Sequence, residues 1–104
     1  MMIQSDVQIA LNKLENSGTL YRGLSLKTRK EVINAIKEFI KHNGLIKSIW
    51  HDDTELKEEY YGIRDFHNNE MYQRMISRWL CLRAKSVDGF EYEYDNITKS
   101  WFEV

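Results

Sequence analysis

The sequence predicts an α+β fold in which N-terminal helices pack on a C-terminal three-stranded antiparallel meander, with residues 45–50 as a candidate fourth strand. Apolar residues recur at helical spacing over residues 5–42, which predicts that the helices come first. Two turn signals divide the end of the chain into alternating segments, which predicts that an antiparallel sheet comes last. At 104 residues the chain has the length of one domain, so residues 1–104 are expected to form a single α+β domain.

The first helix is expected to begin at a cap formed by Ser5 or Asp6 and to end at Asn16-Ser17-Gly18. It is short and has a single apolar stripe, which is typical of a helix that packs on a domain rather than standing alone. The stripe consists of Val7, Ala10, Leu11 and Leu14.

A second helix is expected from a cap at Ser25 or Thr28 to about His42, and Asn43-Gly44 supplies a left-handed stop. Its apolar residues occupy one broad sector of the helical wheel, whereas its lysines gather on the opposite side. The apolar sector comprises Val32, Ile33, Ile36, Phe39 and Ile40.

The segment after this helix is apolar and β-branched over residues 45–50, which is typical of a strand. Residues 55–61 leave two alternatives open. They fit a short helix capped by Asp53 or Thr54, and they also fit a strand that pairs back onto residues 45–50.

Beyond Ser77 the chain fits either a helix that reaches Ala84 or a strand over residues 79–86. Asp88-Gly89, followed by strict alternation over residues 90–94, is typical of a β-hairpin. A hairpin needs an incoming strand, and residues 79–86 are the segment that can supply it. The hairpin signal therefore favours a strand over residues 79–86 rather than a helix that reaches Ala84.

A second hairpin is expected at residues 94–101, which read Tyr-Asp-Asn-Ile-Thr-Lys-Ser-Trp. This segment resembles the turn of the second hairpin in the immunoglobulin-binding domains of protein G, where an aspartate-led loop with a Thr-Lys pair also joins two aromatic-rich strands. The resemblance concerns turn chemistry and implies paired strands at residues 90–95 and 100–104. No antibody-binding function is implied, because nothing else in this chain matches that domain.

Charge is distributed unevenly along the chain, although the net charge is only −1. Residues 1–50 carry eight Lys/Arg and four Asp/Glu, a net +4, whereas residues 51–104 carry seven and twelve, a net −5. Either the two halves face each other in the fold, or one pole meets an external partner. One form of the second explanation is a nucleic-acid mimic, whose carboxylates, Glu91 and Glu93 among them, would engage a basic surface.

The sequence predicts a cytoplasmic protein that does not enter a membrane. No basic N-terminal region precedes a long apolar run, and no apolar stretch approaches the roughly 18 residues that span a bilayer. The single cysteine, Cys81, lies in the apolar run Trp79-Leu80-Cys81-Leu82, and we expect it to be a buried, reduced thiol.

No catalytic, metal or cofactor site is expected. His51-Asp52-Asp53 with His42 or His67 offers ligand atoms, but no two histidines have the i,i+4 spacing of a metal-binding helix. Cys81 has no histidine close to it in sequence, and glycine-rich phosphate loops are absent. The sequence therefore predicts a protein that is not an enzyme.

The aromatic content favours a binding surface, because six tyrosines and three tryptophans occur in 104 residues and both types are common anchors at protein interfaces. We predict a non-enzymatic protein-binding module. Abundant Ile, Lys, Asn and Tyr with few alanines are typical of an AT-rich genome, and a small aromatic-rich domain of this composition resembles phage- or mobile-element-type inhibitors and accessory proteins that act on a host protein or defence complex. The predicted partner-binding residues are Trp50, Glu58, Glu59, Tyr60 and Tyr61.

Two alternatives stay open. The first is a small nucleic-acid-binding regulator that tracks phosphates with the basic helix 25–42 and has Asn34 as its base-reading side chain. The second is a nucleotide-signal sponge with its ligand stacked on the aromatic residues of the sheet. The tail, residues 95–104, is similar to the ending of small phage proteins that sequester nucleotide signals, whose glycine-rich N-terminal half is missing here. The nucleic-acid contacts would be Arg22, Lys27, Lys30, Lys37 and Lys41.

Overall fold

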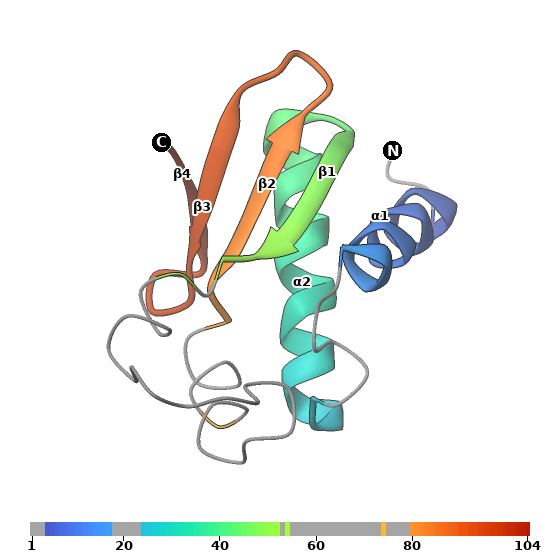
Figure 1. Ribbon diagram of the computed structural model, residues 1–104, viewed down its shortest axis with the longest axis vertical. Coiled ribbons are helices and arrows are strands. Elements are labelled where there is room, and N and C mark those ends of the chain that lie inside the picture. The colour runs from blue at the N-terminus through green and yellow to red at the C-terminus, as the bar shows by residue number, and fades with distance from the viewer. Residues whose placement is uncertain (1–3, 18–23, 53, 55–73, 75–79) are drawn as a thin grey trace.

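The computed structural model describes residues 4–17, 24–52, 54, 74 and 80–104, and the structural statements that follow concern these residues. Its elements are α1 (Gln4–Asn16), α2 (Leu26–Asn43), β1 (Ile46–His51), β2 (Leu82–Ser86), β3 (Glu91–Asp95) and β4 (Ser100–Glu103). The strands form one antiparallel sheet in the order β1-β2-β3-β4, and α2 runs along one face of it (Figure 1). The predicted α+β fold is confirmed, and the candidate fourth strand at residues 45–50 is present as β1.

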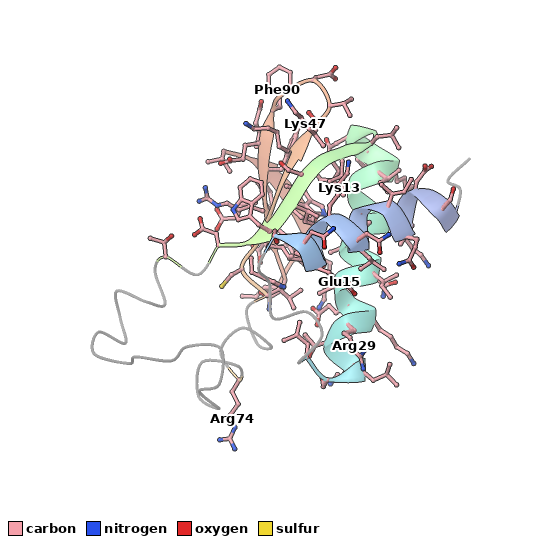
Figure 2. The ribbon with its side chains drawn as sticks, turned by 45° about the vertical axis from the view of Figure 1, so that its right-hand side comes forward. Lys13, Glu15, Arg29, Lys47, Arg74 and Phe90 are labelled. Carbon is pink, nitrogen blue, oxygen red and sulfur yellow. The ribbon has the colours of Figure 1, made fainter. Side chains whose placement is uncertain are left out.

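Helix α1 lies beside β1 and α2 (Figure 1). It begins at Gln4, so the predicted caps Ser5 and Asp6 are wrong, because both residues lie inside the first helical turn. Lys13 extends from α1 to β1 and donates a hydrogen bond from Nζ to the Ile46 carbonyl oxygen at 2.8 Å (Figure 2). The predicted apolar stripe is buried in full: Val7, Ala10, Leu11 and Leu14.

Helix α2 begins where its capping chemistry places it. The Ser25 backbone is extended, and its Oγ accepts a hydrogen bond from the Thr28 N–H at 3.2 Å, so Ser25 is the cap and Thr28 lies in the first turn. The helix ends at Gly44, whose φ of +81° favours glycine and whose N–H donates to the Ile40 carbonyl at 3.1 Å. The predicted left-handed stop is therefore confirmed.

Strand β2 begins at Leu82, three residues after the start predicted from the sequence. Leu80 and Cys81 have φ values of +58° and +52°, and a left-handed backbone cannot continue a pleated ladder. Leu80 is completely buried, and this burial offsets the cost of its backbone conformation. Cys81 is half-buried, so the prediction of a buried thiol is wrong, whereas the choice of strand over helix is confirmed for residues 82–86.

Both predicted hairpins are present. Gly89 has a φ of +93°, and its N–H donates to the Ser86 carbonyl at 2.9 Å to close the β2–β3 turn. In the β3–β4 turn, the Asp95 carboxylate accepts a hydrogen bond from the Ile97 N–H at 2.8 Å. Lys99 leaves this turn with a φ of +58°. These turns join neighbouring strands directly and therefore account for the simple strand order.

The core lies between the two helices and one face of the sheet. Phe39 of α2 packs edge-on against Tyr92 and Trp101, with ring centroids 5.3 and 5.1 Å apart. The Trp101 indole Nε1 donates to the Ala35 carbonyl of α2 at 2.7 Å. These contacts hold α2 across β3 and β4, and they leave the opposite face of the sheet without a described helix.

Candidate functional site

The face of the sheet that no described helix covers carries a row of side chains that crosses all four strands. Trp50 of β1 pairs with Arg83 of β2, Arg83 with Glu93 of β3, and Glu93 with Phe102 of β4. Paired residues on neighbouring strands point to the same face, so these four side chains lie side by side. A second row runs parallel to the first. We call the surface formed by both rows the open face: Ser48, Trp50, Arg83, Lys85, Glu91, Glu93, Phe102 and Val104.

The centre of the open face is an arginine held by carboxylates from three directions. Arg83 Nε lies 3.2 Å from the Asp52 carboxylate, NH1 lies 3.1 Å from that of Glu91, and NH2 lies 3.8 Å from that of Glu93. The Arg83 side chain is only 27% exposed. The guanidinium is therefore fixed in place before any partner arrives.

Asp52 anchors this cluster at the end of β1. Its carboxylate accepts hydrogen bonds from the Thr54 hydroxyl at 2.7 Å and from the Thr54 N–H at 3.2 Å. The hydroxyl hydrogen bond is the main reason that the pKa of Asp52 lies below its usual value, and the nearby Arg83 charge lowers this pKa further against the opposing effect of burial. Asp52 is therefore ionised at neutral pH and presents a permanent charge to Arg83.

Among the described strands, β4 has a neighbour on one side only, and we call its outer side the free edge, which adjoins the open face. Phe102 is 53% exposed and Val104 is 65% exposed on this side of the molecule. The Val104 N–H donates to the Glu91 carbonyl at 2.9 Å. Because hydrogen-bonded pairs alternate along an antiparallel ladder, the main chain of Phe102 also faces β3, whereas the N–H and C=O groups of Trp101 and Glu103 face outward. The other edge strand, β1, is flanked by α1 (Figure 2).

The predicted partner-binding residues divide into two groups. Trp50 lies on the open face and is half-buried there. The other four predicted residues lie outside the described residues: Glu58, Glu59, Tyr60 and Tyr61. The sequence reasoning missed Arg83 and Phe102. Their signal was the alternation along residues 82–86 and 100–103, which puts them on one face once the register is known.

Four of the five predicted nucleic-acid contacts lie on α2, and Arg22 lies outside the described residues. Lys27, Lys30 and Lys41 are exposed and Lys37 is half-buried. None of these four lysines makes an ion pair with another described residue.

The two glutamates of α2 are both engaged. Glu31 pairs with Lys99 of the β3–β4 turn, and Glu38 accepts from His42 Nε2 at 2.8 Å. Within the described residues, the acidic half of the chain therefore does not cancel the lysines of α2. The Glu31–Lys99 pair between α2 and the β3–β4 turn has the opposite sense, because it joins a glutamate of the basic half to a lysine of the acidic half.

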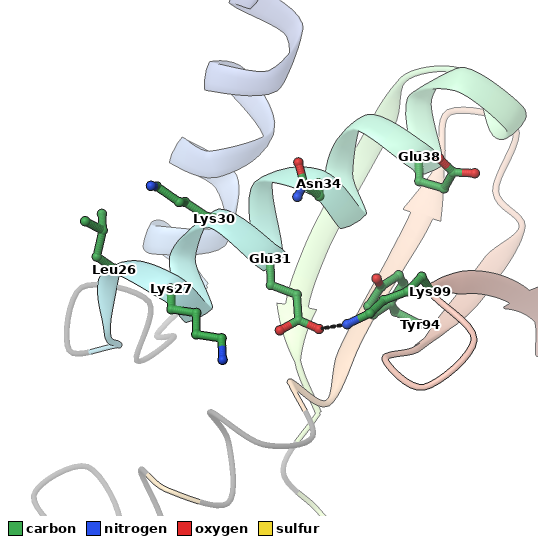
Figure 3. A pocket seen from close by; sticks show the side chains of 8 residues that line it. All are labelled: Leu26, Lys27, Lys30, Glu31, Asn34, Glu38, Tyr94 and Lys99. Carbon is green, nitrogen blue, oxygen red and sulfur yellow. Dashed lines mark hydrogen bonds and ion pairs between the residues drawn. The ribbon is translucent and has the colours of Figure 1, made fainter.

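A groove of about 680 Å³ runs along α2 beside the β3–β4 hairpin (Figure 3). Tyr94 is buried beside the helix, where burial and the negative charges of Glu31, Glu38 and Asp95 raise the pKa of its hydroxyl. The sequence did not predict that Tyr94 and Lys99 line this groove, because both residues lie far from α2 in the chain. The groove is lined by Leu26, Lys27, Lys30, Glu31, Asn34, Glu38, Tyr94 and Lys99.

Among the described residues, no group of three or more His, Cys, Asp and Glu side chains is arranged to hold a metal ion. His51, one of the ligands considered from the sequence, bonds through Nδ1 to the Leu80 carbonyl at 2.5 Å. His67 and Asp53 lie outside the described residues. No helix in the described ranges is long and apolar enough to cross a membrane.

Comparison with protein-family models, with characterised proteins and with solved structures finds no significant match for this chain.

Proposed function

We propose that this protein is a non-enzymatic protein-binding module whose partner docks on the open face and pairs with the free edge of β4. The observation that carries the proposal is the row Trp50–Arg83–Glu93–Phe102, which crosses the whole sheet and lies under no described helix. Aromatic and arginine side chains are enriched among the anchors of protein interfaces. Arg83 is already ordered by its carboxylates, so a partner gains contacts without the entropic cost of fixing this side chain.

The β4 edge explains how a partner would be aligned. The outward N–H and C=O groups of Trp101 and Glu103 can hydrogen-bond to an extended segment, as in other cases of strand addition to a sheet edge. Alternate side chains of the added strand would then lie next to Phe102 and Val104, which supply apolar contact.

The charges of this surface favour a partner with a basic rim. Asp52, Glu91 and Glu93 carry three negative charges against the two positive charges of Arg83 and Lys85. The expected partner segment is therefore extended and apolar at alternate positions, with lysine or arginine at its ends.

The finer proposal is a phage- or mobile-element-type inhibitor or accessory protein that acts in the cytoplasm on a host protein or defence complex. Residue composition is its support. It predicts that expression of this protein inactivates a specific host complex, and an Arg83→Ala variant should lose that effect.

The binding proposal is tested by site-specific photocrosslinking in cells of the source organism. A photoreactive residue at position 102 should capture one partner protein, whereas the same residue at position 97 should not. Ile97 is the matched control, because it is an equally apolar side chain, 75% exposed, in the neighbouring turn.

Two substitutions then test whether the captured partner uses the face and the edge. Phe102→Glu should abolish capture, because it places a carboxylate at the apolar end of the row. Glu103→Pro should also abolish it, because proline removes an outward N–H that β3 does not use. Glu103→Ala keeps that N–H and should bind normally. Equal capture from positions 97 and 102, or capture that survives both Phe102→Glu and Glu103→Pro, contradicts the proposal.

A further inference from the structure

We propose that the groove beside α2 binds a small phosphorylated ligand of nucleotide size, with Lys27 as its phosphate contact and Lys30 at the opposite margin of the groove. The groove lies on the helix-covered side of the sheet, so it is a separate surface from the open face (Figures 1 and 3). The inference goes beyond protein binding and does not depend on it.

The charges of the groove favour an anion. Glu31 already pairs with Lys99, and Glu38 already pairs with His42. The ammonium groups of Lys27 and Lys30 have no carboxylate partner among the described residues, so they remain available to a ligand. Three lysines and two glutamates give the lining a net charge of +1. Lysine ammonium groups are common phosphate contacts in proteins.

Lys27 and Lys30 extend in different directions from the N-terminal end of α2, so a single phosphate group meets only one of them. Figure 3 shows that Lys27 extends toward the side where Glu31 and Lys99 meet, whereas Lys30 and Asn34 leave the helix on the other side. From Leu26 to Glu38 the lining spans twelve residue steps of α2, which corresponds to about 18 Å at the helical rise. A ligand in the groove would therefore be held at its phosphate by the Lys27 ammonium group, at the N-terminal end of α2.

The other side chains of the lining can contact more of a ligand than its phosphate group. The Asn34 amide offers both donors and an acceptor, the Tyr94 side chain borders the groove, and Leu26 supplies an exposed apolar contact. A volume of about 680 Å³ falls in the range of sites for small organic ligands. A phosphorylated molecule with a polar ring or sugar uses these groups, whereas inorganic phosphate leaves them without a partner.

A nucleic acid would use the helix differently. A polymer that tracks α2 would contact Lys37 and Lys41 as well, and neither of these lines the groove. The lining thus favours a compact ligand over the polymer, and a polymer is one of the outcomes that the experiment distinguishes.

The test is titration of the purified protein, followed by heteronuclear NMR and calorimetry, with inorganic phosphate, pyrophosphate, AMP, GMP, adenosine and a single-stranded oligonucleotide. We expect the mononucleotides to bind more tightly than phosphate or adenosine and to shift the side-chain amide signal of Asn34. Lys27→Gln should weaken mononucleotide binding about tenfold, the usual loss for one charge-assisted hydrogen bond, and Lys30→Gln should weaken it less. Lys41→Gln is the matched control on the same helix and should change nothing.

Three results overturn the proposal. The first is the absence of any mononucleotide binding at millimolar concentration. The second is binding that Lys41→Gln weakens as much as Lys27→Gln does. The third is binding of the oligonucleotide alone, with a steep salt dependence shared by all the lysines of α2. Phe102→Glu should leave mononucleotide binding unchanged, because Phe102 lies on the open face and not in the groove. A failure of the groove proposal can therefore be distinguished from a failure of the open-face proposal.

Discussion

Arg83 is the side chain whose removal tests the architecture of the open face most directly. In an Arg83→Met variant the aliphatic stem is largely preserved, so packing on the sheet changes little. The guanidinium is lost, and the carboxylates of Asp52, Glu91 and Glu93 are left close together without a counter-charge. We expect the folded state to be destabilised by both effects.

The distances and exposures set the size of the loss. The contacts of Arg83 with Asp52 and Glu91 are 3.2 and 3.1 Å long and join partly buried side chains, so each should contribute roughly 0.5–1 kcal/mol after solvent screening. The contact with Glu93 is 3.8 Å long and that side chain is 59% exposed, so it should add little. The free energy of unfolding should therefore fall by about 1–2 kcal/mol in Arg83→Met, once carboxylate repulsion is included.

The assay is urea unfolding followed by tryptophan fluorescence, at low and at high ionic strength. The loss should shrink in 1 M salt, where the Debye length is about 3 Å. Lys85→Met is the matched control, since Lys85 lies on the same strand and face and makes no ion pair with a described residue. An equal loss in both variants, or a loss that salt does not reduce, would refute the role assigned to the Arg83 cluster.

Three further predictions concern single interactions. Trp101→Phe removes the indole hydrogen bond to α2 and part of the ring that packs on Phe39, so the free energy of unfolding should fall by about 1–2 kcal/mol, whereas Trp50→Phe should cost less in the same urea experiment. Lys27→Glu should raise the thermal midpoint at low salt, by a stabilisation of about 0.3–1 kcal/mol, because a negative charge suits the first turn of α2, while mononucleotide binding is lost. The pKa of Asp52 is lower in the folded protein than in the unfolded chain, where it is about 4. The ionised carboxylate therefore stabilises the fold above about pH 4, and this stabilisation disappears as the pH falls through the folded pKa. In Thr54→Val, an NMR titration should show the pKa of Asp52 moving up toward its ordinary value of 3.8.

Local sequence predicted the helices and turns well, because their determinants lie within a few residues of one another. Ser25 caps α2 through a hydroxyl three residues from its donor, and Gly44 ends the helix through its own φ. The two hairpin turns depend in the same way on Gly89 and Asp95. The start of β2 could not be predicted, because burial of Leu80 in the tertiary core compensates a left-handed backbone that local propensity disfavours.

The α2 groove depended on contacts that no local pattern contains. Its lining joins the N-terminal half of the helix to Tyr94 and Lys99, and the Glu31–Lys99 pair spans 68 positions of the sequence. Helical periodicity did predict that the lysines would lie opposite the apolar sector of α2. The packing of Trp101 on Phe39 decided which lysines border the groove, because it sets the distance between α2 and the β3–β4 hairpin.

For the described residues, the sequence by itself determined the α+β class and the order of helices, turns and strands, although the start of β2 was not among the boundaries it predicted. Only the tertiary structure decided which face of the sheet α2 covers. On β4, alternation separates Trp101 from Phe102, but both are aromatic, so hydrophobicity does not say which of them is buried. The same ambiguity holds for Ile49 and Trp50 on β1. The register between four strands and the contact of Phe39 with Trp101 resolve it, and they leave Trp50, Arg83 and Phe102 together on the open face.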